Sequence, residues 1–460
     1  MRKLWPLLFY LSLYGSWPMF QHDPKHTGRS NIAGPAQEPS SPLRIELQDP
    51  ISAPPTVGED TTVYVVTLNG RVAALDFKKG RIKWKKEIGS PIKASPAIKG
   101  EKIFFGAQDG YFYALNTSNG EVVWKREVGV VNSSPCLRGD RLYFAGGNSI
   151  FAYSTQGAEQ WKHTTKSSIS SSPAVGDDGW VYFQTYYGDS LGVYGLDAAG
   201  KRRWFFPTSG GIASPSIGID GNIYIGDQGG VFYAIDSKKG TLLWQDTLGI
   251  ITSTPAIGKD GTIYIGSKST GLFYALKPED GELKGSYSTD NVTASPLIDG
   301  ADRVYIGSLN TNFYCLLSDL RYSWRKSLND RIEVGAAIGP DGTIYVGTKK
   351  GTVYALSAKS GVTQSSLESP YTLSLSPNPF KKSMTISFQL PEETVISLRV
   401  YNAMGRVAKT FAKIESRDSK IYRVIWDGKD TQGHKVPSGV YFICLKTDKS
   451  IHIKRAVLIR

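Results

Sequence analysis

Hydrophobic and polar residues alternate in short runs over most of the chain, and glycine-containing turns separate these runs. In residues 213–245, four such runs are divided by turns that include Asp220-Gly221 and Lys239-Gly240. Alternation with a period of two is typical of β-strands that bury one side. Glycine suits the turns because it adopts positive φ without a Cβ clash. The segment therefore predicts four short strands joined by tight turns.

The same pattern occurs eight times in succession. A proline opens seven of the units at intervals of 38–42 residues, and alanine takes its place in the eighth: Pro55, Pro96, Pro135, Pro173, Pro215, Pro255, Pro296 and Ala337. An aromatic residue recurs in the second strand and tryptophan in most fourth strands: Tyr64, Phe104, Tyr143, Tyr182, Tyr224, Tyr264, Tyr305, Tyr345, Trp84, Trp124, Trp161, Trp204, Trp244 and Trp324. A ligand site breaks the symmetry of a ring whereas a packing rule repeats around it, so we interpret these residues as core between units. Four-stranded units at this spacing predict a β-propeller with one blade per unit.

The two ends of the repeat indicate how the ring closes. Residues 42–47 (PLRIEL) resemble the fourth strand at residues 83–88, whereas the fourth strand of unit eight, residues 362–367, is weak. We therefore predict that the N-terminal strand completes the last blade. The expected fold is all-β, with an eight-bladed propeller over residues 41–367. Seven blades are the alternative if unit eight is not a true blade.

The segment before the propeller has three parts. Residues 1–16 carry Arg2 and Lys3 before a short apolar run, which is the layout of a secretory signal peptide; a buried N-terminal strand is the alternative. Residues 17–40 are expected to form an arm and connector. His22, Asp23 and His26 could ligate a metal, but Pro24 lies between them, so we favour packing on the propeller. No other apolar run is long enough for a transmembrane helix.

Residues 41–362 follow the pattern SPxxxxGxxYxGxxxGxxYALDxxxGxxxW and resemble the PQQ-like β-propeller repeat family. The family includes quinoprotein dehydrogenases as well as scaffolds that bind no quinone. The resemblance implies, for such dehydrogenases, an adjacent cysteine pair over the quinone, a tryptophan floor, and carboxylate and asparagine ligands to calcium. Cys136, Cys315 and Cys444 are not adjacent to one another, and no catalytic motif appears. We therefore expect no enzyme activity and no cofactor.

Function is expected where the units differ. The turn at residues 185–192 is three residues longer in unit four than in unit five, and it holds Tyr186, Tyr187 and Asp189. It should share a face with the connections that enter each first strand, which hold Lys93, Asn132, Lys166, Asp290, Arg331 and Glu333. The hypothesis is that this face binds a protein or a glycan, with Tyr186 and Tyr187 as aromatic platforms. The alternative is a merely variable surface loop.

After a linker at residues 368–375 the repeat ends, and residues 376–460 predict a small β-sandwich. The motifs SPNPF, VYNAMGRV, WDGKDTQGHKVPSGVY and KRAVLIR resemble the C-terminal sorting domain of type IX secretion cargo, which shares its sandwich with the Ig-like domain of FlgD. The resemblance implies that the chain is exported to the cell surface or medium by the type IX machinery. Lys454 and Arg455 belong to the basic end of that sorting signal.

The formal net charge of +13 is unevenly distributed. From Tyr371 onward there are 16 Lys and Arg against 7 Asp and Glu, so the propeller itself is nearly balanced. There is no long basic run, and we expect no nucleic-acid function. The leading hypothesis is an exported binding or scaffold protein. The alternatives are an enzyme on the same propeller, either quinone-dependent or polysaccharide-degrading, and an assembly scaffold of the outer membrane; the absence of a cysteine after the signal peptide disfavours the lipoprotein form of that scaffold.

Overall fold

The computed structural model describes residues 16–357, 373–389, 394–402, 406–411, 414–416, 421–446 and 451–459. The chain divides into two compact domains, Met1–Gly361 and Val362–Arg460. Every regular element among the described residues is a strand. None of these residues forms a helix long and apolar enough to cross a membrane. The predicted signal peptide lies outside the described residues except for Ser16.

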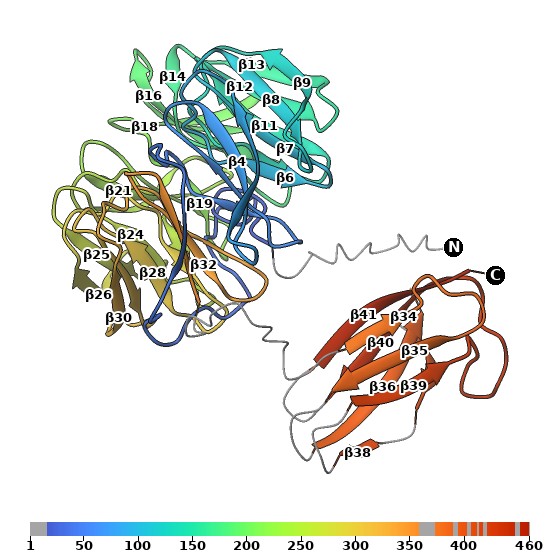
Figure 1. Ribbon diagram of the computed structural model, residues 1–460. Helices are drawn as coiled ribbons and strands as arrows, with labels where there is room; N and C mark the ends of the chain where they lie inside the picture. The colour runs from blue at the N-terminus through green and yellow to red at the C-terminus, as the bar shows by residue number, and fades with distance from the viewer. Residues whose placement is uncertain are drawn as a thin grey trace, which may run out of the picture. The chain divides into compact units, whose positions relative to one another are not determined.

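The described residues of the first domain form eight antiparallel sheets (Figure 1). In chain order, the first four sheets are formed by β2 (Thr56–Val57), β3 (Val63–Val66), β4 (Arg71–Asp76) and β5 (Arg81–Glu87); β6 (Ala97–Lys99), β7 (Lys102–Gly106), β8 (Tyr111–Asn116) and β9 (Val122–Glu127); β10 (Cys136–Arg138), β11 (Arg141–Gly146), β12 (Ser149–Ser154) and β13 (Glu159–Thr164); and β14 (Ser167–Ile169), β15 (Ala174–Val175), β16 (Val181–Gly188), β17 (Gly192–Leu196) and β18 (Arg202–Pro207).

The other four sheets follow the same order, except that the last strand of the final sheet comes from the N-terminal side of the chain. They are formed by β19 (Ser216–Ile217), β20 (Ile223–Gly226), β21 (Val231–Ile235) and β22 (Leu242–Thr247); β23 (Ala256–Ile257), β24 (Ile263–Gly266), β25 (Leu272–Leu276) and β26 (Leu283–Ser288); β27 (Leu297–Ile298), β28 (Val304–Gly307), β29 (Asn312–Leu316) and β30 (Tyr322–Ser327); and β31 (Ala337–Ile338), β32 (Ile344–Gly347), β33 (Thr352–Leu356) and β1 (Leu43–Glu46).

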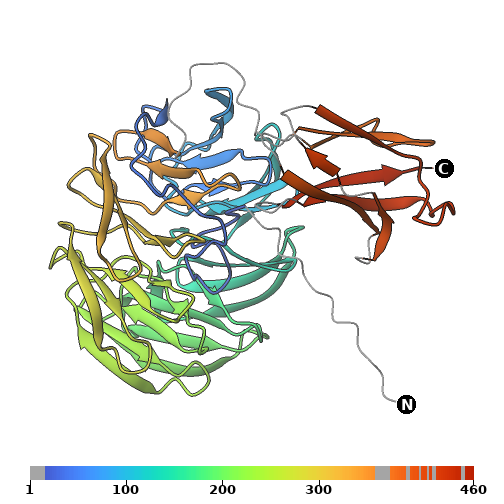
Figure 2. The same cartoon turned by 90° about the horizontal axis from the view of Figure 1, so that it is seen from below.

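The ring is closed by pairing between the two ends of the repeat. β1 runs antiparallel to β33, with Leu43 opposite Ala355 and Glu46 opposite Thr352. Figure 2 shows the blue N-terminal strands beside the orange strands of the last unit. β2 of the first sheet also contacts β31 of the last, and one hydrophobic core joins them. The predicted closure by the N-terminal strand is confirmed, because it pairs where unit eight needs its fourth strand.

Tryptophans in the fourth strands connect neighbouring sheets by a hydrogen bond. Trp84 packs on Tyr64 with ring centroids 6.0 Å apart, and its Nε1 donates a 2.7 Å hydrogen bond to the carbonyl of Thr117 in the following unit. Equivalent bonds of 2.8–3.3 Å join Trp124 to Thr155, Trp161 to Ala198, Trp204 to Ser237 and Trp244 to Pro278. The repeated aromatic residues are therefore core between units, as predicted. Each ring buries apolar area while its polar tip bonds to the neighbouring sheet.

Residues 17–35, the arm, cross the ring and bond to one innermost strand after another. Trp17 and Val57 exchange two backbone hydrogen bonds of 2.9 and 3.0 Å. Further backbone bonds of 2.7–2.8 Å run to the arm carbonyls of Pro18, Pro24, Lys25, Thr27 and Gly28 from Ile98, Val175, Ile217, Ile257 and Ile298. The arm thus pairs with strand edges that would otherwise be open. The packing role that the sequence favoured for this segment is confirmed.

The second domain is a small sandwich of two antiparallel sheets. One sheet contains β34 (Leu373–Ser376), β35 (Met384–Gln389) and β39 (Ile421–Trp426), and the other contains β36 (Thr394–Asn402), β37 (Val407–Thr410), β38 (Ile414–Ser416), β40 (Gly439–Lys446) and β41 (Ile451–Leu458). Phe388, Trp426 and Ile443 lie in its buried core. β34 includes residues that we expected in the linker, because Leu373 and Leu375 alternate with serines and pair with β35. The rest of that linker lies outside the described residues.

Candidate functional site

A cavity of about 390 Å³ opens at the centre of the ring, where the chain enters each first strand. We call it the funnel. All eight units contribute to its wall, which places it on the axis of the ring. The lining consists of Phe20, Pro54, Lys93, Asn132, Ser134, Ser170, Ser172, Tyr186, Ile212, Ser214, Thr252, Thr254, Thr293, Ser295, Glu333, Val334 and Gly335. This volume falls in the lower part of the ~300–1,000 Å³ range of small-molecule sites.

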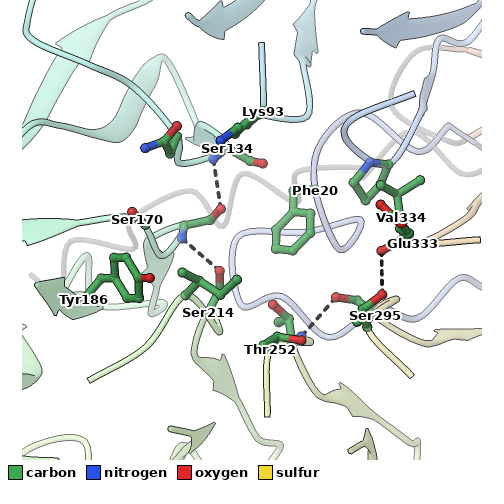
Figure 3. A pocket seen from close by; sticks show the side chains of 17 residues that line it. Phe20, Lys93, Ser134, Ser170, Tyr186, Ser214, Thr252, Ser295, Glu333 and Val334 are labelled. Carbon is green, nitrogen blue, oxygen red and sulfur yellow. Dashed lines mark hydrogen bonds between the residues drawn. The ribbon is translucent and has the colours of Figure 1, made fainter. Parts of the chain in front are cut away.

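Phe20 comes from the arm, and Figure 3 shows its ring in the middle of the lining residues. The ring meets His26 edge to face, with centroids 5.2 Å apart. His26 is in turn held by a 3.0 Å contact between its Nδ1 and the carbonyl of Pro215. Since the arm bonds to the innermost strands on either side, Phe20 sits on a fixed base. It closes one end of the funnel.

Buried polar groups hold the arm beneath the funnel. Asp23 accepts backbone hydrogen bonds from Lys25 (2.9 Å) and Thr27 (3.2 Å), and a further bond from the Thr27 hydroxyl. Burial opposes ionisation of Asp23, but contacts with His22 and Thr27 outweigh it and lower the pKa of the carboxyl. Burial lowers the pKa of His26 to about 4. The described residues contain no group of three or more His, Cys, Asp and Glu placed to hold a metal.

A belt of hydroxyl groups surrounds the funnel. Four of the serines that precede an opening proline accept a hydrogen bond from the equivalent backbone N–H of an earlier unit. These bonds run from Ser95 to Ser134 (2.9 Å), Ser134 to Ser172 (2.9 Å), Ser172 to Ser214 (2.8 Å) and Thr254 to Ser295 (3.0 Å). Ala336 and Pro54 stand at this position in units eight and one, so the belt is interrupted there. The lining is therefore asymmetric although the ring repeats.

The long turn of unit four has a different structure from the expected loop. β16 continues to Gly188 and pairs with an additional strand, β14, which makes this sheet five-stranded. Ser168 lies opposite Tyr187 and Ile169 opposite Thr185, so Tyr186 is the extra residue of a β-bulge. A bulge redirects a side chain. Tyr186 accordingly lines the funnel, whereas Tyr187 is 78% exposed outside it.

The remaining candidate residues divide in the same way. Lys93, Asn132 and Glu333 line the funnel with Tyr186. Figure 3 shows Lys93, Glu333 and Tyr186 around the cavity. The exposed residues Lys166, Asp189, Asp290 and Arg331 are outside its lining, as is Tyr187. Glu333 forms a 2.8 Å ion pair with Lys349. Sequence reasoning missed Phe20 and the hydroxyl belt. The serine that precedes five of the seven opening prolines was the signal for the belt.

None of the three cysteines belongs to the lining of the funnel. Cys136 and Cys315 are buried between strands, and Cys444 is half-buried in the sandwich. Burial raises the pKa of Cys315 to about 12 and raises that of Cys136 further. Both thiols stay protonated at neutral pH and behave as small core residues.

In the sandwich, two of the motifs noted in the sequence lie side by side. The Asn378 side chain donates a 2.8 Å hydrogen bond to the carbonyl of Arg455 and accepts a 2.9 Å bond from the backbone N–H of Val457. Phe380 continues the contact, because its N–H bonds to the Val457 carbonyl and its own carbonyl accepts from Ile459. The SPNPF segment therefore fixes the end of β41. Lys454 and Arg455 are exposed on that strand.

Two family models match the chain. The model described as "Outer membrane protein assembly factor BamB" matches residues 40–154 and 146–365, which is more than half of the chain. The model described as "Secretion system C-terminal sorting domain" matches residues 374–460. The second match identifies the sandwich as a type IX sorting domain, so the chain is exported to the cell surface or the medium.

Solved structures of similar fold include both enzymes and a non-enzyme. Quinohemoprotein alcohol dehydrogenase from Comamonas testosteroni matches with a TM-score of 0.65 and 13% identity, over 77% of this chain and 83% of that one. BamB from Moraxella catarrhalis matches with a TM-score of 0.56 and 17% identity, over 70% and 98%. A europium-containing methanol dehydrogenase matches with a TM-score of 0.58 and 14% identity, over 72% of this chain and 89% of that one. At these identities the likeness shows the fold alone.

A curated relative covers only part of the chain. The serine/threonine-protein kinase/endoribonuclease ire-1 of Caenorhabditis elegans is 30% identical over 97 residues. The match takes in 20% of this chain and 10% of that protein, so the chain spans about a tenth of this relative's length.

The quinone and calcium that the dehydrogenase resemblance implies do not fit the funnel lining. The aromatic side chain at its base is Phe20 and not tryptophan, and no cysteine is in the lining. Glu333 is the single carboxylate in the lining, and Lys349 already neutralises it. Two carboxylate or amide oxygens that converge on one cation are not provided. The family model that matches the propeller repeats covers more than half of the chain. This chain therefore belongs to the family described as outer membrane protein assembly factor BamB.

Proposed function

We propose that the chain is an exported binding protein that holds its ligand in the funnel. One observation carries this proposal: in a ring whose packing repeats in unit after unit, the funnel is the place where the units differ. The Tyr186 bulge, the Lys93 cation and the interruption of the belt at Pro54 and Ala336 each occur once. Packing explains why a feature repeats around the ring, so the features that occur once indicate where the ring recognises a ligand.

Neighbouring tyrosines provide a matched test. Full-length protein carrying Tyr186→Ala or Tyr187→Ala is immobilised and used to recover material from native cell envelopes. Tyr186→Ala should lose the recovered ligand, whereas Tyr187→Ala should retain it, because only Tyr186 lines the funnel. If both variants recover the ligand as well as the parent does, the funnel is not the binding site.

Binding without catalysis is the proposed role. The charged side chains of the lining are Lys93 and Glu333, and the latter forms an ion pair with Lys349. General acid–base hydrolysis of a glycan needs two carboxyl groups across the scissile bond. The lining offers one. Incubation of the recovered ligand with the protein should therefore return it unchanged; appearance of product would establish the enzyme alternative.

The family description favours a second candidate, an assembly scaffold of the outer membrane. Deletion of the encoding gene followed by measurement of folded outer-membrane proteins tests it. If the chain is a binding protein that acts after export, its loss should leave the level of folded outer-membrane proteins unchanged. If it is an assembly scaffold, its loss should lower that level.

A further inference from the structure

The belt hydroxyls have unused hydrogen-bonding capacity that faces the funnel. A serine hydroxyl has one proton and two lone pairs. In Ser134, Ser172, Ser214 and Ser295 one lone pair accepts a backbone N–H, and among the described residues the proton has no assigned acceptor. A hydroxyl that already accepts a hydrogen bond is polarised into a better donor. The wall therefore presents several oriented O–H donors to whatever occupies the funnel.

Two longer side chains add to this donor set. The Oδ1 atom of Asn132 accepts a 2.8 Å bond from Gln108, and Asn132 lines the funnel, so its amide N–H groups are the donors that remain for a ligand. Lys93 lines the funnel and forms no ion pair with any described residue. Glu333 does not compensate it, because its carboxylate is 2.8 Å from Lys349. The lining is consequently rich in donors and carries an uncompensated positive charge, which favours an anionic ligand with many acceptors.

The aromatic side chains define the shape of the ligand. Phe20 lies at the base of the funnel and Tyr186 in its wall (Figure 3). The negative faces of such rings attract the C–H face of a sugar ring, while the sugar hydroxyls turn to the donors. The volume of about 390 Å³ admits one or two sugar rings.

Building on the proposed function, we propose that the funnel binds the carboxylate-bearing end of an acidic saccharide. The sugar ring packs on Phe20 and Tyr186, its hydroxyl oxygens accept from the belt serines, and its carboxylate lies at Lys93 and Asn132. The opening at the outer end leaves room for the rest of a longer chain. An acidic polysaccharide outside the cell is a ligand that an exported protein can reach.

Calorimetry with the full-length protein tests the inference. The probes are galacturonic acid, its short oligomers, galactose and malonate. Galactose keeps the ring without the carboxylate, and malonate keeps carboxylates without the ring. Galacturonate oligomers should bind at least about tenfold more tightly than galactose or malonate, which is the effect of one charge-assisted hydrogen bond.

Matched lysine variants locate the binding. Lys93→Gln should weaken galacturonate oligomer binding by about tenfold or more. Lys166→Gln removes a lysine outside the funnel lining and should leave the affinity unchanged. Phe20→Leu should weaken galacturonate and galactose alike. Melting temperatures identify any variant that has unfolded.

The outcomes separate this inference from the proposed function. Equal binding of galacturonate and galactose, or equal affinity in the parent and Lys93→Gln, overturns the acidic class. If malonate binds as tightly as the galacturonate oligomers, the sugar ring is not recognised and the ligand is not a saccharide. If no saccharide binds but Tyr186→Ala still loses a protein recovered from envelopes, this inference is wrong and the proposed function stands. If neither test depends on the funnel, both are wrong.

Discussion

The indole Nε1 of Trp324 donates a 3.1 Å hydrogen bond to the backbone carbonyl of Pro35, which lies 289 residues earlier in the chain. The Tyr305 hydroxyl donates to the same carbonyl at 3.0 Å. In earlier units the equivalent tryptophan bonds to the next unit, as Trp244 does to Pro278. At unit seven the acceptor comes from the arm instead. The arm is thus part of the same fastening that runs around the ring.

Trp324→Phe should release the arm. The substitution removes one buried hydrogen bond and part of the ring area, so we expect a loss of about 1–2 kcal/mol in the free energy of unfolding. Trypsin should then cleave faster after Lys25 or Arg29 within the arm. Trp244→Phe is the control, because it removes an equivalent bond that does not involve the arm. Equal cleavage of the arm in both variants would contradict a fastening role for Trp324.

Gly281→Ala should be among the costly hairpin substitutions. Gly281 has a φ of +78°, and an added Cβ would lie 2.6 Å from the Trp244 ring. Gly100 has a φ of +56° but open space around it, so Gly100→Ala measures backbone strain alone. We expect about 1 kcal/mol for Gly100→Ala and about 1–3 kcal/mol more for Gly281→Ala. Urea unfolding gives both values. A similar cost for the two would mean that the tryptophan moves aside.

The parts of the fold that repeat could be predicted from the sequence. Each aromatic position occurs in several units, so its packing role stands out above local variation. The closing strand was predictable because its sequence resembles a fourth strand and pairs in that place.

Features that occur once could not be predicted in the same way. The arm has no regular period, and positive φ values at Gln21, His22 and His26 give it a course that no propensity encodes. Phe20 reaches the funnel only through that course. The inward direction of Tyr186 depends on a one-residue bulge, so the sequence placed Tyr186 and Tyr187 together although the structure separates them.

His26 should make the protein sensitive to acid. Burial lowers its pKa to about 4, although the Pro215 carbonyl and Asp23 both act to raise it. The ordinary pKa of a histidine is 6.5, so between pH 6.5 and pH 4 the unfolded chain binds a proton that the folded chain does not. Stability is therefore lost as pH falls from 6.5 towards 4, by up to about 3 kcal/mol.

The His26→Asn variant isolates this contribution. Asparagine tolerates the positive φ of 58° at this position and can still donate to the Pro215 carbonyl, but it does not titrate. Urea unfolding at pH 7 and at pH 4.5 should show a smaller loss of stability in the variant than in the parent. The same loss in both would assign the acid sensitivity to other groups, such as Asp23.

Export should depend on the exposed basic pair of β41 separately from the folding of the sandwich. Lys454 and Arg455 are exposed, so their replacement by glutamine should leave the unfolding transition of the sandwich unchanged while the protein accumulates inside the cell envelope. Asn378→Ala acts differently: it removes the two side-chain bonds that fix Arg455 and Val457, and it should cost about 1–3 kcal/mol of stability. Lys382→Gln, an exposed change elsewhere in the domain, is the control for both. Fractionation of cells and medium, together with urea unfolding of the purified variants, measures the two effects. Normal export of the Lys454→Gln/Arg455→Gln protein would show that the machinery recognises another part of the domain.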